Sequence, residues 1–138
     1  MTSLGPVHRM PVRVYYEDTD FSGAVYHASY LRFMERGRTE LLRTCGLNQG
    51  ALMAGQGEAA YGFVVRDLTI SFITPARMDD WLEVETQILT LRGASLEMEQ
   101  IIRRQGAALA KAKVKIACVA QGRPLRLPES VRKALSQV

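Results

Sequence analysis

The chain has few of the residues that build metal sites and disulfide frameworks. Its 138 residues include only two cysteines, Cys45 and Cys118, and only two histidines, His8 and His27. These four residues are too widely separated to form a zinc-binding spacing. Both cysteines fall on predicted apolar faces, so we expect two buried thiols, with a disulfide as the less favoured alternative. No metal site and no cofactor are predicted.

Long apolar runs and a strong charge imbalance are also lacking. The N-terminal segment MTSLGPVHRMPVRVYY has no apolar run typical of a signal peptide, and no stretch is long enough to span a bilayer. The net charge of +4 suits an anionic small molecule or an acidic protein better than a nucleic acid. No aromatic platform interleaves with the basic residues, as single-stranded RNA binding requires. We expect a cytoplasmic protein without a transmembrane segment or a nucleic-acid partner.

The length and the hydrophobic fraction of 47% fit a single domain over residues 1–138, in which residues 1–10 form a loose arm. Val12, Val14 and Tyr16 alternate with polar neighbours and predict a first strand with one buried face. From Ala28 to Cys45 the apolar residues recur at three- and four-residue steps, which predicts an amphipathic helix. Strands follow at residues 61–73, with a slip near Asp67, and at 81–91, 96–104 and 109–120, before a short helix at 129–137.

This order predicts an α+β domain in which one long helix packs against a curved antiparallel sheet of about five strands. Gly37 lies in the apolar stripe of the helix, where a missing side chain lets another element approach closely. So small a sheet leaves its edges exposed, and we expect edge-to-edge oligomerisation.

The segment YYEDTDFSGAVYHASY, residues 15–30, concentrates acidic residues between apolar ones. Continued alternation places Asp18 and Asp20 on the core side with Tyr16, just before the helix begins. The free N–H groups of a helix N-terminus can hold a developing oxyanion, and a nearby carboxylate can attack a carbonyl or activate water. A carboxylate here can also simply cap the turn or the helix. The residues alone leave both interpretations open.

The same segment carries Thr19-Asp20, Gly23, Val25-Tyr26-His27 and Tyr30. In this pattern it resembles the acyl-CoA thioesterases of the 4-hydroxybenzoyl-CoA thioesterase type, and more closely the Tol-Pal-associated YbgC family. The later segments FVVRDLTISFITPARMDDWLEV and RGASLEMEQ are similar to that family too. The resemblance implies the hotdog fold, in which a sheet wraps a long helix, and hydrolysis of the thioester of a short-chain or aromatic acyl-CoA.

The resemblance also implies roles for individual residues. Asp20 matches the catalytic carboxylate, His27 and Tyr16 match assisting positions, and the backbone N–H of His27 would polarise the thioester carbonyl. For His27, a side chain without a proton role is an equal alternative. The segments that match the family also predict substrate contacts at seven positions: Gly23, Val25, Tyr26, Phe63, Val64, Val65 and Arg66.

Other charged residues have simpler interpretations. We expect Asp18 to be structural, and Glu35 to form an internal ion pair with Arg38 rather than to act in catalysis. The strand lysines, Lys111, Lys113 and Lys115, fit a solvated face better than a site for the phosphates of coenzyme A.

The main alternative function is a module of the same fold that binds acyl-CoA or acyl-carrier protein without turnover. A hotdog dehydratase does not fit the motif. The predicted partners are acyl-CoA, with acyl-carrier protein as a second candidate, and other copies of the chain in a homodimer or a dimer of dimers. In that assembly Asp20 of one chain would face the segment from Phe63 to Arg66 of another.

Overall fold

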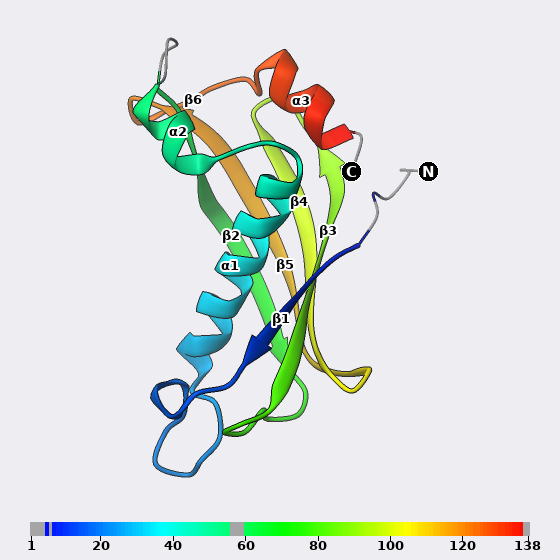
Figure 1. Cartoon of the computed structure of the whole chain (residues 1–138). Helices are drawn as coiled ribbons and strands as arrows, with labels where there is room; N and C mark the ends of the chain where they lie inside the picture. The colour runs from blue at the N-terminus through cyan, green and yellow to red at the C-terminus, as the bar shows by residue number, and fades with distance from the viewer. Residues whose placement is uncertain (1–4, 6, 56–59, 137–138) are drawn as a thin grey trace.

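The computed structural model describes residue 5 and residues 7–55 and 60–136 of the chain (Figure 1). A short strand leads through one 3-10 turn into the long helix. A small helix and four long strands come after the long helix. In chain order the elements are β1 (His8–Arg13), η1 (Tyr16–Asp18), α1 (His27–Thr44), α2 (Gln49–Ala54), β2 (Gly62–Phe72), β3 (Trp81–Leu91), β4 (Ser95–Arg104), β5 (Ala107–Ala120), β6 (Arg123–Pro124) and α3 (Glu129–Ser136).

The strands form one antiparallel sheet in the order β1-β3-β4-β5-β2, and the two-residue strand β6 pairs with β5 at the side of this path. Helix α1 lies against one face of the curved sheet, and α3 covers one end of it (Figure 1). The predicted α+β hotdog architecture, with a long helix against a sheet of about five strands, is confirmed. Strands β1 and β2 form the two edges of the sheet.

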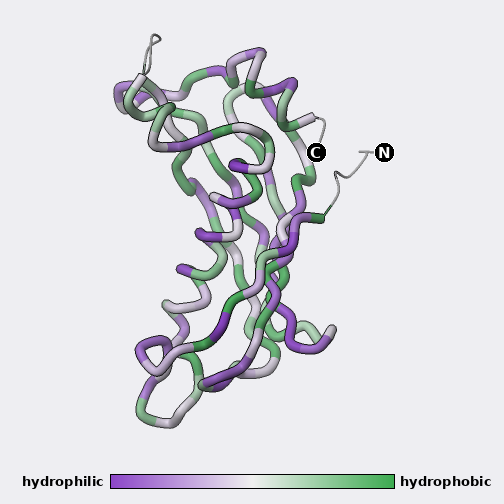
Figure 2. Tube along the Cα trace, in the orientation of Figure 1, coloured by the Kyte–Doolittle hydropathy of each residue, from purple (hydrophilic) through white to green (hydrophobic). Residues whose placement is uncertain are grey.

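Alternation along the strands decides which side chains enter the core. On β5, Ala112 and Val114 are buried in the core, whereas Lys111 and Lys113 are exposed on the outer face. Across the outer face Lys113 pairs with Glu99 of β4 and Lys115 with Glu97, so acidic residues alternate with the lysines. Figure 2 shows the strands changing colour repeatedly between hydrophilic and hydrophobic. This mixture of charges matches a solvated face.

Helix α1 comes very close to the sheet at Gly37. A Cβ atom added there would lie 2.8 Å from Cγ1 of Val84, 3.1 Å from Oγ1 of Thr86 and 3.2 Å from Nε2 of Gln100. The same stripe buries Phe33 as part of the core. The predicted reason for a glycine in the helix interior, a close approach of the sheet, is therefore confirmed.

Strand β2 is bulged and open at its edge. Its register against β5 shifts between Val65 and Asp67, at the position where the sequence pattern slips. Because β2 has a neighbour on one side only, its apolar side chains are poorly covered: Val65 is 46% exposed and Phe72 is 44% exposed. An uncovered apolar edge of this kind favours pairing with another strand.

Two predicted segments differ from the structure. Strand β1 begins at His8, so three residues expected in the loose arm lie in the sheet; residues 1–4 and 6 lie outside the described residues. The connection after α1 contains a helix, α2, which begins at an N-cap where Oδ1 of Asn48 accepts from the N–H of Ala51 at 3.1 Å. A six-residue helix has too little apolar periodicity to be read from the sequence.

The cysteines do not pair. Both are free, Cys118 is buried and Cys45 is half-buried. Burial raises the pKa of both thiols, which opposes formation of a reactive thiolate. Among the helices in the described part of the chain, none has the length and apolar character needed to cross a membrane.

Candidate active site

A tight turn before α1 holds Asp20. The N–H of Asp20 donates to the carbonyl oxygen of Ala24 at 2.9 Å, and the N–H of Gly23 donates to the carbonyl oxygen of Asp20 at 3.1 Å. Gly23 has φ of +85°, a left-handed conformation that glycine adopts without a Cβ clash. Oδ1 of Asp20 accepts from both the hydroxyl and the N–H of Ser22, the latter at 2.8 Å. The turn therefore fixes the carboxylate by its local sequence.

The same hydrogen bonds set the charge of Asp20. The hydroxyl of Ser22 is the largest cause that lowers the pKa of the Asp20 carboxyl, followed by the N–H of Ser22. The charge of His27 lowers this pKa further, although partial desolvation acts in the opposite direction. Hydrogen bonds and nearby positive charge stabilise the ionised form of a carboxyl. Asp20 is thus a carboxylate at neutral pH, ready to act as a nucleophile or a base.

Helix α1 begins directly beside this turn. Its N-cap, Tyr26, has an extended backbone and no side-chain cap hydrogen bond, and the first turn carries no acidic residue. The first N–H groups of a helix have no acceptor within the helix, and they carry a partial positive charge. The N–H of His27 is the first of them. This end of α1 can therefore hold a carbonyl oxygen that becomes negative during a reaction.

A cavity of about 220 Å³ joins the turn, the helix start and the end of β2. The ring of His27 lies 4.6 Å from the ring of Phe72, and the ring of Tyr30 lies 5.3 Å from it, measured between centroids. The hydroxyl of Tyr30 accepts from the N–H of Ala76 at 2.9 Å, which ties α1 to the loop after β2. The lining residues are Asp20, Ala24, Val25, His27, Tyr30, Phe72, Ile73, Thr74 and Pro75.

The first strand ends earlier than its alternation predicts. The chain turns into η1 after Arg13. Tyr16 is 81% exposed and Asp20 is also exposed, so the prediction that these two residues face the core is wrong, whereas Asp18 is buried as predicted. The physical reason is Asp18, whose Oδ2 accepts from the N–H of Tyr15 at 2.8 Å and closes the turn. The backbone carbonyl of Asp18 also accepts from the N–H of Tyr26 at 2.9 Å. Asp18 is buried and holds the loop together, as a structural carboxylate would.

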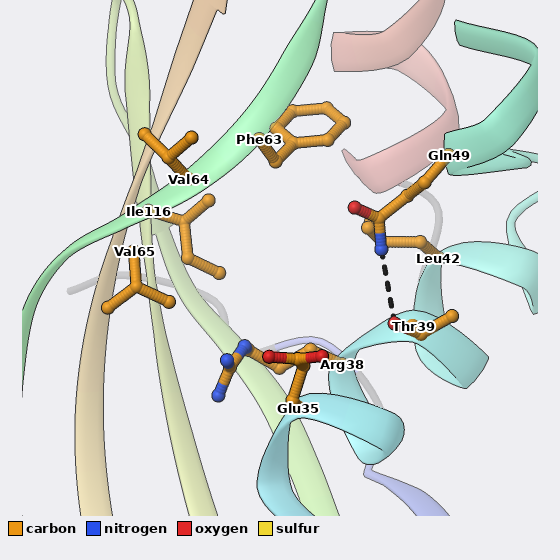
Figure 3. Close-up of a pocket in the computed structure, with 9 residues that line it drawn as sticks. All are labelled: Glu35, Arg38, Thr39, Leu42, Gln49, Phe63, Val64, Val65 and Ile116. Atoms are coloured by element: carbon orange, nitrogen blue, oxygen red, sulfur yellow. Dashed lines mark hydrogen bonds between the residues drawn. The ribbon is translucent and has the colours of Figure 1, made fainter. Parts of the chain in front are cut away.

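A second cavity, of about 280 Å³, lies between α1 and the opposite end of β2 (Figure 3). Arg38 lines it, and its Nη1 donates to Oε1 of Gln100 on β4 at 2.9 Å. The expected ion pair with Glu35 is not formed: among the described residues, no basic nitrogen lies within 4.0 Å of the Glu35 carboxylate. The residues that line this second cavity are Glu35, Arg38, Thr39, Leu42, Gln49, Phe63, Val64, Val65 and Ile116.

The predicted site residues thus separate into three groups. The first cavity brings together Asp20, Val25 and His27. The second holds Phe63, Val64 and Val65. The remaining four, Tyr16, Gly23, Tyr26 and Arg66, line neither cavity.

Part of the first cavity was not predicted from the sequence. Phe72, Ile73, Thr74 and Pro75 come from the end of β2 and its loop. The only sequence signal for this part of the cavity was Pro75. It marks the end of the strand, but it does not indicate that the strand ends beside the start of α1. In the described ranges, no three His, Cys, Asp or Glu side chains gather as metal ligands.

Comparisons with known proteins identify the family of the chain. The family model of the thioesterase-like superfamily matches residues 14–135. The acyl-CoA thioester hydrolase YbgC of Escherichia coli O6:H1 is 48% identical over 89% of this chain and 91% of its own length, and the acyl-CoA thioesterase YbgC of Haemophilus influenzae is 48% identical over 90% of each chain. A solved structure of a probable thioesterase from Bartonella henselae has a TM-score of 0.86 and 47% identity, and the match covers 89% of this chain and all of that one. The chain therefore belongs to the thioesterase-like superfamily and is similar to YbgC thioesterases over most of its length, which confirms the family predicted from its sequence.

Proposed function

We propose that the chain hydrolyses the thioester of a short-chain or aromatic acyl-CoA, with Asp20 as its catalytic carboxylate. One observation carries this proposal: the ionised Asp20 and the uncapped N-terminus of α1 lie at the same cavity. Thioester hydrolysis needs both a nucleophile or base and a donor for the carbonyl oxygen. The YbgC relatives, whose names state this activity, support the same reaction class.

In the reaction, the thioester carbonyl would accept a hydrogen bond from the N–H of His27. Asp20 would then follow one of two routes. As a nucleophile, it forms a mixed anhydride and releases the thiolate of coenzyme A, and water hydrolyses the anhydride. As a base, it removes a proton from water, which attacks the carbonyl; the tetrahedral intermediate then breaks its C–S bond and releases the thiolate of coenzyme A, which takes up the proton. Both routes give the free acid and coenzyme A.

Two side chains would assist. The imidazole of His27 lines the cavity with Asp20 and can orient the attacking water. Tyr16 enters the proposal through the family resemblance alone, because its exposed side chain does not line this cavity. We therefore assign the larger assisting effect to His27.

The cavities favour a small acyl group. Their volumes are about 220 and 280 Å³, and an apolar cavity of roughly 150 Å³ already accommodates benzene. Phe63, Val64 and Val65 give the second cavity an apolar wall. A short aliphatic chain or a single aromatic ring fits this space.

The alternative function, binding of acyl-CoA or acyl-carrier protein without turnover, makes a different prediction in one assay. Free thiol is measured while the protein is incubated with a panel of short-chain, long-chain and aromatic acyl-CoAs. The proposal predicts that each protein molecule releases many molecules of thiol, and that release is fastest with the small acyl groups. Binding of an acyl-CoA without release of thiol would favour the binding module.

We further propose that the site is shared between two copies of the chain, in a homodimer or a dimer of dimers. Within one chain the Asp20 cavity lies at the Phe72 end of β2, whereas the second cavity lies at its Phe63 end. Antiparallel pairing of two β2 edges would place the Phe72 end of each copy beside the Phe63 end of the other. Asp20 of one copy would then face the segment from Phe63 to Arg66 of the second copy.

Mixed dimers test this arrangement. One chain carries Asp20→Asn, and the other carries Val65→Trp, which fills the wall of the second cavity. Each homodimer should be inactive, but in the mixed dimer one site carries both changes and the other carries neither, so activity should return. Verified heterodimers without recovered activity, or a fully active monomer, would rule out a shared site.

A further inference from the structure

Arg38 is a buried cation that forms few hydrogen bonds and no ion pair with the described residues. Its side chain is 8% exposed, and its one hydrogen bond within the described residues runs from Nη1 to the neutral amide oxygen of Gln100. Gln100 is itself fixed, because its Nε2 donates to the carbonyl oxygen of Met34 and to Oγ1 of Thr86, both at 2.9 Å. A guanidinium has five N–H donors, so most of the hydrogen-bonding capacity of Arg38 is unused.

No carboxylate balances this charge at short range. Among the described residues, the ion pairs within 4.0 Å involve other arginines, and none involves Arg38. Glu35 acts on Arg38 only through its charge, and it lies exposed on the same helix, where solvent screens it. The unpaired N–H groups of Arg38 are accessible from the second cavity rather than sealed in the core, so water or an anionic ligand can accept from them.

The unused donors face the second cavity. Figure 3 shows the guanidinium of Arg38 projecting from α1 toward the strands that carry Val65 and Ile116. Thr39 and Gln49 are tied to each other on the helical side of the cavity, because Nε2 of Gln49 donates to Oγ1 of Thr39 at 3.2 Å. The cavity therefore combines an apolar wall with the cation of Arg38, and the exposed carboxylate of Glu35 also lines it.

We propose that this cavity binds the far end of the acyl group, and that this end carries a carboxylate held by Arg38. This inference rests on the proposed thioesterase function and on the shared site, which places the cavity beside Asp20 of the second copy. The planar fork of a guanidinium matches a carboxylate in a bidentate pair, and such charge-assisted pairs are the strongest of the ordinary hydrogen bonds. A purely alkyl end would leave the buried donors of Arg38 unpaired.

The substrates that test this are glutaryl-CoA and hexanoyl-CoA, in which an ethyl group takes the place of the terminal carboxylate. The wild-type protein should show a kcat/KM for glutaryl-CoA higher by about tenfold or more, as expected for one buried charge-assisted pair. This comparison needs no variant. A wild-type protein that hydrolyses hexanoyl-CoA equally well or better would overturn the inference.

Two matched variants locate the effect. Arg38→Gln should abolish the preference by lowering the rate with glutaryl-CoA while retaining that with hexanoyl-CoA. Arg36→Gln removes the same charge from an exposed position on α1 and should keep the preference. An Arg38→Gln protein in which both substrates slow equally, together with a weaker dimer, would instead show that Arg38 pairs with the second copy.

Binding of free glutarate separates failure of this inference from failure of the proposed function. Titration calorimetry should detect binding of glutarate to the wild-type protein and its loss in Arg38→Gln, even if no acyl-CoA is hydrolysed. Absence of thiol release with every acyl-CoA would refute the hydrolase, whereas equal binding of glutarate by both proteins would refute the role of Arg38.

Discussion

Replacing Gly37 with leucine should destabilise the domain strongly, because the sheet leaves no room beside α1. A Cβ atom at this position would lie 2.8 Å from Cγ1 of Val84. Carbon atoms in contact prefer separations of roughly 3.5–4.0 Å, so the first added atom already overlaps by about 1 Å. Val84, Thr86 and Gln100 are each 0% exposed and have no free space to move into.

The expected magnitude follows from two opposing contributions. Removing the glycine gains about 1 kcal/mol of helix propensity, whereas overpacking typically costs roughly 1–3 kcal/mol for a few added methylenes. Leucine adds three carbons beyond Cβ, and displacing Gln100 also strains its hydrogen bonds to Met34 and Thr86. Together with the strain on these hydrogen bonds, we therefore expect a net loss of about 2 kcal/mol in the free energy of unfolding. For a chain of this length that corresponds to a fall in Tm of roughly 8 °C.

The assay is thermal unfolding followed by circular dichroism at one fixed protein concentration, because oligomerisation makes Tm depend on concentration. Arg36→Leu is the matched control, since it introduces the same side chain at an exposed position of the same helix. The control should change stability by no more than about 0.5 kcal/mol. An unchanged Tm for Gly37→Leu would show that α1 does not pack closely on the sheet.

Two further predictions concern the turn that holds Asp20 and the start of α1. Ser22→Ala removes the largest cause of the low pKa of Asp20, so this pKa should rise in an NMR titration, and the acid limb of kcat/KM should move to higher pH. In the wild type, the ionised Asp20 stabilises the fold above the ordinary pKa of 3.8, and this stabilisation is lost as the pH falls through the lower folded-state value. An unchanged titration would mean that Ser22 does not hold the carboxylate. His27→Ala should lower kcat more than Tyr16→Phe, because only His27 lines the cavity with Asp20; a larger effect at Tyr16 would contradict the single-chain geometry.

The long elements could be predicted because their periodicity is set by burial. Helix α1 begins at His27 and ends at Thr44, each within one residue of the expected bounds, and β3 matches its predicted range. The slip at Asp67 and the glycine at position 37 were visible because each interrupts a regular pattern for a geometric reason.

Local hydrogen bonds explain what the pattern missed. Alternation predicted that the first strand continues through Tyr16, but the carboxylate of Asp18 captures the N–H of Tyr15 and turns the chain. Helix α2 has recognisable ends, with Asn48 as an N-cap and Gly55 in a left-handed conformation (φ of +68°), yet it is too short to show a period.

Which distant side chains meet each other could not be predicted from the sequence. Arg38 and Gln100 are 62 positions apart, and their hydrogen bond depends on how α1 crosses β4. The same holds for Phe72, which reaches His27 only because the end of β2 lies beside the start of α1. The motif around Asp20 predicted the family, whereas the walls of the cavity could be seen only in the fold.

The most direct test of this account is the rate of thiol release by Asp20→Asn with the best acyl-CoA of the panel. The substitution preserves the shape of the side chain and removes the charge that both proposed routes require. The account predicts a loss of most of kcat with an unchanged circular dichroism spectrum. Asp18→Asn, the matched control in the same loop, should have a smaller effect on kcat because Asp18 only closes the turn. Near wild-type kcat in Asp20→Asn, or a larger loss in Asp18→Asn, would contradict the assignment of Asp20 as the catalytic carboxylate.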